Sequence, residues 1–320
     1  MSLPLSPPLA PQLARAAKTL PTGAEIVYEV KLDGFRCVAF LDGPDAFLQS
    51  RNGKSLSRYF PELSLPDGRY VLDGEIVVRD DAGREDFDAL GQRVHPAVSR
   101  IQRLSVETPA VYVAFDLLAL DDRSLLDQPF HERRAALERL LAGDAFAAAP
   151  VELMVSVSDA ADAERWLRDA EGAIAKARSA AYLPGKRAGM VKVKRVRTID
   201  AVIVGWRPGS EPRTVGALIL GLYDDSGELR TVGHCSGLTA SAKRDLVDRL
   251  APYATGAKGS GEPSRWSAGR DLEWVQLRPE LVLEVSFDHV SAGRIRHGAK
   301  LLRWREDKDP RACAIEQLYA

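Results

Sequence analysis

The chain has 320 residues, of which 45% are hydrophobic and 28% are charged, and its formal net charge is −1. This length allows about two domains with their own cores, and the composition excludes a disordered or fibrous protein. No apolar run reaches the roughly eighteen residues of a spanning helix, and the first residues lack a signal-peptide pattern, so we expect a cytoplasmic protein. The three cysteines show no CxxC spacing, which excludes a zinc finger and a disulfide framework.

The first 198 residues predict an α+β domain. Five prolines within residues 4–21 predict an extended strap rather than a first helix. Apolar or alternating runs bounded by turn residues then predict strands at 25–29, 37–40, 70–78 and 111–118. Helices are predicted at 130–141, from its apolar face, and at 159–170, behind a Ser158/Asp159 cap. Mainly antiparallel sheets with helices follow from this order.

The pattern changes after Thr198. Short strands are predicted at 201–206, 217–223, 230–234 and 281–287, and one helix at 240–250 opens at Thr239. Several short strands with a single helix predict a small Greek-key barrel such as the OB-fold. We therefore place the domain boundary at 198–200, giving domains 1–198 and 199–320. The Gly- and Ser-rich residues 256–269 predict a flexible loop inside the barrel.

Basic residues are concentrated in two stretches of this nearly neutral chain. Residues 178–197 hold seven basic residues and no acidic one, and residues 294–308 hold six basic residues against two acidic ones. Local basic stretches fit a protein that binds phosphate groups on one face. A merely solvated charged surface is the alternative.

One lysine stands out because of its position and its neighbours. Lys31 follows the predicted first strand and opens the sequence Lys31-Leu32-Asp33-Gly34-Phe35-Arg36. A lysine is nucleophilic only when deprotonated, and an ordinary pKa of about 10.4 leaves roughly one in several thousand neutral at pH 7. A nearby cation such as Arg36, with partial desolvation, would lower that pKa. The Asp33-Gly34 turn would let the backbone approach a ligand.

Further motifs follow Lys31 in order along the chain. They are Ser50-Arg51-Asn52-Gly53, Leu72-Asp73-Gly74-Glu75-Ile76-Val77, Val113-Ala114-Phe115-Asp116-Leu117, Glu171-Gly172-Ala173-Ile174-Ala175-Lys176, Val191-Lys192-Val193-Lys194 and Arg303-Trp304-Arg305-Glu306-Asp307-Lys308. This series resembles the covalent nucleotidyltransferase superfamily, whose ligase members carry K-x-D-G-x-R around an adenylylated lysine. Stretches such as DFDALGQRVHP and RWREDKDPRAC are similar to small bacterial ATP-dependent DNA ligases of the actinobacterial ligase C type and to the ligase module of ligase D. The resemblance implies an adenylation (nucleotidyltransferase) domain followed by an OB-fold β-barrel domain.

The resemblance also implies a role for each matched residue. Lys31 would attack the α-phosphate of ATP, assisted by Lys192, Lys194 and Arg36. The implied nucleotide-binding residues are Glu29, Lys31, Arg36, Arg51, Glu75, Phe115, Lys176, Lys192, Lys194, Arg303, Arg305, Asp307 and Lys308. Those of the C-terminal motif would close over ATP by means of a hinge near 198–200. The implied Mg²⁺ ligands, with Mn²⁺ also possible, are Glu75 and Glu171. The implied DNA contacts are Arg51, Lys186, Arg187, Arg195, Arg294 and Arg296.

The implied function is sealing of 5′-phosphate/3′-hydroxyl nicks in duplex DNA through a lysyl-AMP and a DNA-adenylate, in DNA repair. An RNA-capping guanylyltransferase, an RNA ligase of the same superfamily and a catalytically dead nick-binding module are the alternatives. Because only thirty residues precede Lys31, we expect the two domains themselves to grip the duplex. We expect a monomer at the nucleoid, with any repair polymerase or end-binding protein supplied in trans.

Overall fold

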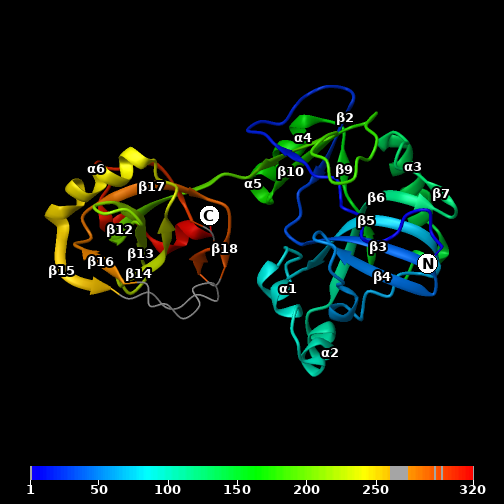
Figure 1. Cartoon of the computed structure of the whole chain (residues 1–320), viewed down its shortest axis with the longest axis horizontal. Helices are drawn as coiled ribbons and strands as arrows, with labels where there is room; N and C mark the ends of the chain where they lie inside the picture. Colours follow the sequence, from blue (N-terminus) through cyan, green and yellow to red (C-terminus); the bar gives the residue numbers. More distant parts are fainter. Residues whose placement is uncertain (1, 260–272, 292, 297, 320) are drawn as a thin grey trace. The chain divides into compact units, whose positions relative to one another are not determined.

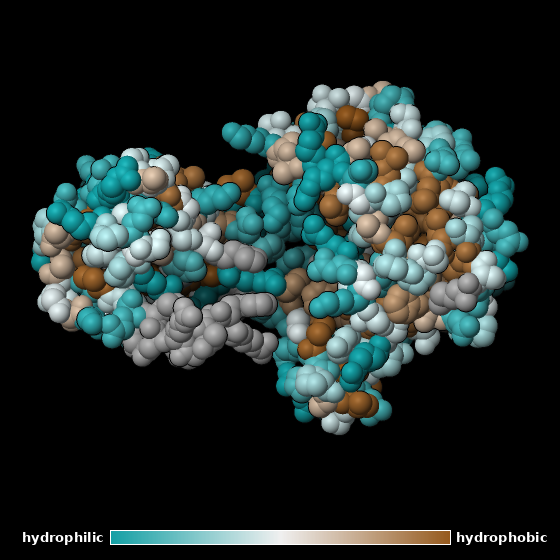
Figure 2. Space-filling model, viewed as in Figure 1, coloured by the Kyte–Doolittle hydropathy of each residue, from teal (hydrophilic) through white to brown (hydrophobic). Residues whose placement is uncertain are grey.

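The chain folds into two compact units, Met1–Arg195 and Val196–Ala320 (Figure 1). The structure, a computed structural model, describes residues 2–259, 273–291, 293–296 and 298–319. The division falls three residues before the predicted boundary region. Hydrophilic side chains cover much of the visible surface (Figure 2), and the apolar residues gather in separate cores within the units. Within the described ranges, no helix has the length and apolar character needed to cross a membrane.

The first unit is built on two sheets, as far as the structure describes it. One runs in the order β1-β11-β10-β2-β9, and the other runs β4-β3-β5-β6-β7 with β8 beside β6. The strands are β1 (Arg15–Ala16), β2 (Ile26–Val30), β3 (Phe35–Gly43), β4 (Asp45–Ser50), β5 (Gly68–Val78), β6 (Ala110–Leu120), β7 (Arg123–Ser124), β8 (Val151–Leu153), β9 (Ser156–Val157), β10 (Gly172–Ala177) and β11 (Met190–Lys194). Most ladders are antiparallel, as the sequence predicts, whereas β1 pairs with β11 in parallel.

Short helices and 3₁₀ turns connect these strands. They are η1 (Ser57–Tyr59), α1 (Phe87–Arg93), α2 (Val98–Glu107), α3 (Phe130–Leu141), η2 (Asp144–Phe146), α4 (Ala160–Glu164) and α5 (Trp166–Asp169). Helix α3 has the predicted bounds, and the predicted cap at Asp159 accepts a hydrogen bond from Ala161 N at 2.9 Å. Helices α1 and α2 were not predicted from the sequence.

An N-terminal strap, residues 2–16, connects the two sheets. Its Leu3, Leu5 and Leu9 pack on the cluster of buried residues around Phe40, and Leu9 exchanges backbone hydrogen bonds with the Gln49 side chain at 2.9 and 2.7 Å. The strap then reaches the other sheet, where β1 lies beside β11. The extended conformation predicted from its prolines is therefore a structural link between the sheets.

The second unit is an OB-fold barrel. Its strands are β12 (Arg197–Pro208), β13 (Val215–Tyr223), β14 (Leu229–Cys235), β15 (Ala254–Gly259), β16 (Trp274–Leu277), β17 (Val282–Phe287), β18 (Val290–Ser291), β19 (Arg294–Ile295) and β20 (Lys300–Trp304), and its helices are α6 (Ala240–Leu250), η3 (Ala251–Tyr253), η4 (Pro310–Ala312) and η5 (Ile315–Leu318). Neighbours run β14-β13-β12-β17-β20, and a parallel bridge between Cys235 and Ala299 connects β14 back toward β20. With α6 between β14 and β17, this is the predicted OB-fold order.

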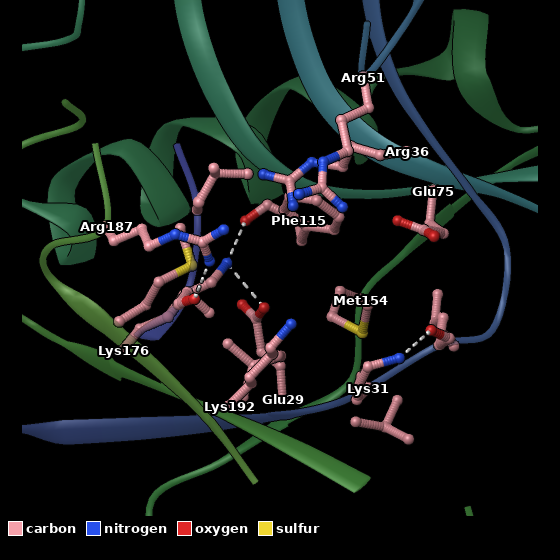
Figure 3. A pocket seen from close by; sticks show the side chains of 16 residues that line it. Glu29, Lys31, Arg36, Arg51, Glu75, Phe115, Met154, Lys176, Arg187 and Lys192 are labelled. Carbon is pink, nitrogen blue, oxygen red and sulfur yellow. Dashed lines mark hydrogen bonds and ion pairs between the residues drawn. The ribbon is translucent and has the colours of Figure 1, made fainter. Parts of the chain in front are cut away.

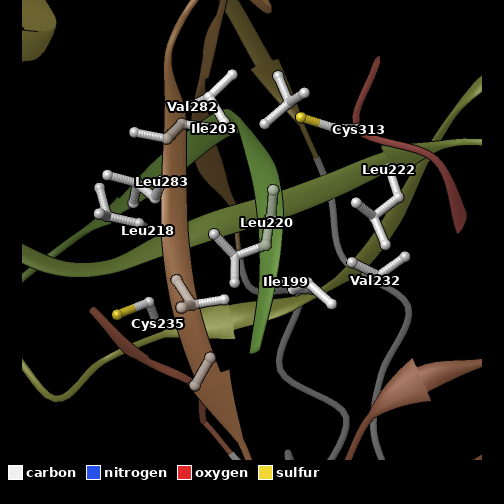
Figure 4. Packing of buried hydrophobic residues seen from close by; sticks show 14 of the residues in the cluster. Ile199, Ile203, Leu218, Leu220, Leu222, Val232, Cys235, Val282, Leu283 and Cys313 are labelled. Atoms are coloured by element: carbon white, nitrogen blue, oxygen red, sulfur yellow. The ribbon is translucent and has the colours of Figure 1, made fainter. Parts of the chain in front are cut away.

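The barrel interior is apolar and contains two of the three cysteines. Figure 4 shows Ile199, Ile203, Leu218, Leu220, Leu222, Val232, Val282 and Leu283 converging from its strands beside Cys235 and Cys313. Cys235 and Cys313, like Cys37 in the first unit, are free and fully buried. All three behave as small core hydrophobes.

Two predictions for this region need correction. Residues 254–259 belong to β15, which pairs with β16, so the loop predicted at 256–269 is wrong for 256–259; the rest of that prediction, 260–269, lies outside the described residues. The predicted hinge at 198–200 lies within β12, where Thr198 pairs with Ser286 and Asp200 with Glu284. Polar residues alternate with apolar ones there because the strand is half-buried. Arg195 and the exposed Val196 are the residues between β11 and β12.

Candidate active site

A pocket in the first unit collects side chains from both sheets (Figure 3). Strands β2, β10 and β11 contribute Glu29, Ile174 and Lys192, whereas β3, β5 and β6 contribute Arg36, Glu75 and Phe115. The remaining lining residues are Leu13, Ala14, Val30, Lys31, Leu32, Arg51, Met154, Lys176, Arg187 and Met190. Residues that lie far apart in the sequence therefore meet at one concave surface.

Lys31 lies at the end of β2, with its side chain 19% exposed. Its backbone N donates to Gly172 O at 2.9 Å, which connects it to the start of β10. The ammonium group lies 3.5 Å from Glu171 Oε1, and Lys194 Nζ lies 3.3 Å from the same oxygen. Partial burial, followed by the charges of Lys194 and Lys31, lowers the pKa of Lys192. This end of the pocket is therefore strongly cationic and suited to phosphate groups.

Two glycines allow this close backbone packing. A Cβ at Gly34 would lie 2.4 Å from Ile76 O, and a Cβ at Gly172 would lie 2.2 Å from Val193 O. Gly172 also has φ +141°, which L-amino acids with side chains rarely adopt. Gly34 therefore lets β5 pack closely against the backbone here. From the sequence, we expected Gly34 to let the backbone approach a ligand.

Acidic and aromatic side chains form another part of the pocket. Glu29 is 2% exposed, and its Oε2 lies 2.7 Å from the buried Lys176 Nζ. Lys176 Nζ is also 4.6 Å from the ring centroid of Phe115, and the Arg36 guanidinium lies 4.5 Å from that same ring. Phe115 therefore lines the pocket with two cations close to its ring.

Arg36 is fixed by a buried hydrogen-bond network. Its Nε and Nη2 donate to the two oxygens of Asp73, each at 2.6 Å, and Asp73 is fully buried. The Tyr182 hydroxyl donates to Asp73 Oδ2 at 2.6 Å and accepts from Gln12 N at 3.0 Å. Because Gln12 belongs to the N-terminal strap, this network joins the strap to the pocket.

Glu75 has an unusual acidity. Burial raises its pKa to about 7, although the charges of Arg36 and Lys31 oppose that shift. The carboxyl group is therefore poised to gain or lose its charge near neutral pH.

Family comparisons agree with this geometry. Residues 7–194 match the model of the ATP dependent DNA ligase domain, and residues 211–308 match the ATP dependent DNA ligase C terminal region. The chain belongs to the ATP-dependent DNA ligase family. It is 45% identical to DNA ligase C1 of Mycolicibacterium smegmatis and 42% identical to DNA ligase C of Mycobacterium tuberculosis, each over 99% of this chain and 96% of the relative. The ligase domain of M. tuberculosis LigD is 31% identical, with a TM-score of 0.52 over 96% of this chain and 98% of that domain.

These matches confirm the fold class and the DNA ligase activity expected from the sequence. Of the predicted nucleotide-binding residues, the pocket of this ligase brings together Glu29, Lys31, Arg36, Arg51, Glu75, Phe115, Lys176 and Lys192. Lys194 reaches Lys31 through their shared partner Glu171. Leu13 and Ala14, which also line the pocket, were not predicted, although the strap sequence PPLAPQLA was already similar to that of small ligases.

The predicted DNA contacts of the ligase are distributed over both units. Arg187, predicted to contact DNA, lines the pocket and donates to Ala14 O at 3.3 Å. Lys186 is exposed in the turn just before it. In the second unit, Arg294 belongs to β19 and Arg296 follows it. Contacts of these residues with DNA stay predictions.

The C-terminal motif of the ligase is engaged within the second unit. Arg305 Nη1 donates to both Asp200 oxygens at 2.7 and 2.8 Å, and its other nitrogens donate to Asp307 at 2.9 Å. Lys308 Nζ lies 3.6 Å from Asp200, and Arg303 pairs with Glu284. The hydrogen bond from Arg305 lowers the pKa of Asp307 to about 2. These basic side chains are therefore already bound to carboxylates.

A preformed cluster of three or more metal-ligating residues is absent from the part of the ligase that the structure describes. Magnesium commonly binds one or two carboxylates together with substrate phosphates and water. Glu171, whose side chain is 10% exposed next to Lys31, has the donor chemistry for that arrangement.

Proposed function

We propose that this ligase seals nicks in duplex DNA with Lys31 as its covalent nucleophile. The observation that supports this most strongly is the position of Lys31 in the pocket, beside Lys192 and within reach of Glu171. In the first step, Lys31 Nζ attacks the α-phosphorus of ATP, an N–P bond forms, and the bond to pyrophosphate breaks. The attack requires the neutral amine of Lys31.

The second and third steps transfer and release AMP. An oxygen of the 5′-phosphate at the nick attacks the α-phosphorus, and the N–P bond to Lys31 breaks to give a DNA-adenylate. The 3′-hydroxyl then attacks the 5′-phosphorus, loses its proton and displaces AMP. Lys192 and Lys194 lie where they would stabilise the charge that develops on the phosphate oxygens. Arg36 and Arg51 would contribute further phosphate contacts from the opposite sheet.

Glu29 and Phe115 would recognise the adenine base. Glu29 Oε1 is buried and has no hydrogen-bond partner among the described residues, so it can accept from the 6-amino group of adenine. Guanine carries a carbonyl oxygen at that position and would face a carboxylate without a proton to share. The ring of Phe115 would stack on the base, and Glu75 would accept from a ribose hydroxyl. This arrangement supports ATP as the substrate.

Magnesium would be held by Glu171 together with the phosphates of ATP, and Mn²⁺ has compatible ligand chemistry. Such an ion neutralises phosphate charge and makes pyrophosphate a better leaving group. Glu75, the other predicted ligand, lines the pocket with Lys31. Its raised pKa favours contact with a ribose hydroxyl over contact with the metal.

The DNA substrate would be bound through its backbone. The predicted contacts Arg51, Lys186, Arg187, Arg195, Arg294 and Arg296 are suited to phosphates and carry no base-reading pattern, so sealing should depend little on sequence and weaken with salt. We place the ligase in DNA repair, as a monomer at the nucleoid. A repair polymerase or end-binding protein would act in trans.

The test of this proposal is adenylylation in the absence of DNA. The purified chain is incubated with Mg²⁺ and α-labelled ATP or GTP, and the covalent adduct is then chased onto nicked duplex. We expect an ATP-specific adduct that transfers to DNA and is absent from Lys31→Ala, which should still bind nicked DNA. Sealing by Lys31→Ala, or an adduct formed only with GTP, would contradict the proposal.

A further inference from the structure

Lys176 is a buried cation that takes no part in the three reaction steps proposed above. It is 5% exposed, and its Nζ lies 2.7 Å from Glu29 Oε2 and 3.4 Å from Phe115 O. The same ammonium lies 4.6 Å from the ring centroids of both Phe115 and Phe130. A buried lysine needs replacements for its lost hydration, and here two aromatic faces and one carboxylate provide them. Its charge is therefore directed at a single anion, Glu29.

Two other charged groups near Glu29 make their hydrogen bonds elsewhere, although Arg134 Nη1 remains beside Glu29 without a hydrogen bond of its own. Arg134, from α3, lies 3.7 Å from Glu29 Oε1 but donates to Glu138 Oε1 and to Met154 O, each at 2.7 Å. Asp116, from β6, is held by Arg133 at 2.8 and 2.9 Å. Among the described residues, Lys176 is thus the cation in hydrogen-bond contact with Glu29.

The protonation state of Glu29 decides which purine it can recognise. An ionised carboxylate only accepts hydrogen bonds, which suits the amino group of adenine, whereas a neutral carboxylic acid can donate to the carbonyl oxygen of hypoxanthine or guanine. Burial raises the pKa of Glu29, Lys176 and then Arg134 lower it, and Asp116 raises it. Loss of the Lys176 charge would therefore favour the neutral acid.

We propose that Lys176 is a specificity-determining positioning residue, which holds Glu29 ionised and oriented so that the ligase selects a 6-aminopurine nucleotide. Lys176 acts through Glu29 and leaves the base contact to the carboxylate. This inference rests on the proposed contact between Glu29 and adenine. Phe130, on the first turn of α3, adds a second aromatic face that keeps the lysine in place without neutralising it.

The experiment compares ATP with ITP in wild type and Lys176→Met. ITP differs at the 6-position without adding the 2-amino group of GTP. Formation of the lysyl-nucleotide adduct on the full chain is measured from about pH 6 to about pH 9, and the ratio of kcat/KM for the two nucleotides is plotted. The ratio cancels every pH dependence that the two substrates share.

We expect the ATP preference of Lys176→Met to fall about tenfold near neutral pH. Because Lys176 lowers the pKa of Glu29, the preference should recover only as the pH rises, with a midpoint about one pH unit or more above that of wild type. Lys176→Arg keeps the charge and should restore the preference. Lys54→Met, on an exposed loop of the first unit, should leave both the preference and its pH profile unchanged.

Two further variants distinguish a failure of the role proposed for Lys176 from a failure of the adenine contact of Glu29. Lys176→Gln keeps a hydrogen-bond donor without charge and replaces Lys176→Met if thermal unfolding shows that Lys176→Met does not fold. Glu29→Gln should lose the ATP preference at every pH; an unchanged preference would overturn the adenine contact itself. If Glu29→Gln loses the preference but the uncharged Lys176 variants keep the wild-type profile, the role of Lys176 is overturned while the adenine contact stands.

Discussion

Glu75 shows how one buried carboxyl can give this ligase a pH dependence near neutrality. Its pKa of about 7 results from burial, which outweighs the attraction of Arg36 and Lys31. Below that pH the neutral acid is a weaker acceptor for the proposed ribose hydroxyl, and above it the ionised group is a stronger one. Nucleotide affinity should therefore improve as the pH rises.

We expect the KM for ATP in self-adenylylation to fall as the pH rises through about 7. Glu75→Gln should raise this KM roughly tenfold at pH 8, the cost of a lost charge-assisted hydrogen bond, and should make it insensitive to pH. The pH dependence of kcat should be the same in both proteins. A wild-type KM that is constant between about pH 6 and about pH 8.5 would contradict this assignment.

At the residue scale, motifs identified the pocket residues but not their partners. Lys31, Glu75, Phe115 and Lys192 were all found by their order along the chain, and the pocket brings them together. The bidentate contact of Arg36 with Asp73 could not be predicted, since it depends on the register between β3 and β5. The same holds for Lys176 and Glu29, which meet because β2 lies beside β10.

At the scale of elements, the N-terminal strap forms one wall of the pocket. Leu13 and Ala14 line the pocket, and Leu13 N donates to Lys186 O at 2.9 Å. The Tyr182 hydroxyl connects the strap to Asp73, and through Asp73 to Arg36. The position of the strap and the geometry of the pocket are therefore coupled.

Tyr182→Phe tests that coupling. Removal of the hydroxyl leaves Gln12 N–H without its acceptor, which should lower the free energy of unfolding of the first unit by about 1–3 kcal/mol. The KM for ATP should rise several-fold while kcat changes little. Tyr70→Phe is the matched control, because Tyr70 is equally buried and its hydroxyl donates to Pro66 O, away from the strap. Equal KM changes in the two variants would rule out a specific role for the strap.

Element prediction succeeded where a helix was long and periodic. Helices α3 and α6 were found with their observed bounds, and α6 begins at the predicted Thr239 cap, which accepts from Ala242 N at 3.2 Å. Helix α1 was missed because it is short and contains Gly91, and α2 because it starts just after Pro96 without a capping side chain. Their helical state depends on packing more than on local sequence.

At the scale of the whole molecule, the C-terminal motif is held by carboxylates of its own unit. The C-terminal motif is predicted to close over ATP. For Arg305 to contact the phosphates, it must first give up its hydrogen bonds to Asp200. Arg305 and Asp200 are largely buried, with side chains 17% and 12% exposed, so this contact is worth more than an ordinary surface ion pair. Asp200 would thus oppose the first step of the reaction.

Asp200→Asn should therefore accelerate self-adenylylation by up to about tenfold, because Arg305 is released from this contact. Sealing of a nick that already carries the DNA-adenylate should be unchanged, since that step needs no ATP. Asp224→Asn removes a carboxylate that pairs with Arg230 in the same unit and should affect neither rate. Slower adenylylation by Asp200→Asn would show that the contact supports the first step.

The inaccessible thiols of Cys37, Cys235 and Cys313 have a practical consequence for studying how the two units move. Burial raises the pKa of each thiol, to about 11 for Cys313, so maleimide or methanethiosulfonate reagents should leave all three unmodified in the folded protein. One surface cysteine introduced into each unit could then carry a spin label or a fluorophore in an otherwise native sequence. Distances between the labels would follow the catalytic cycle from ATP to sealed DNA in solution.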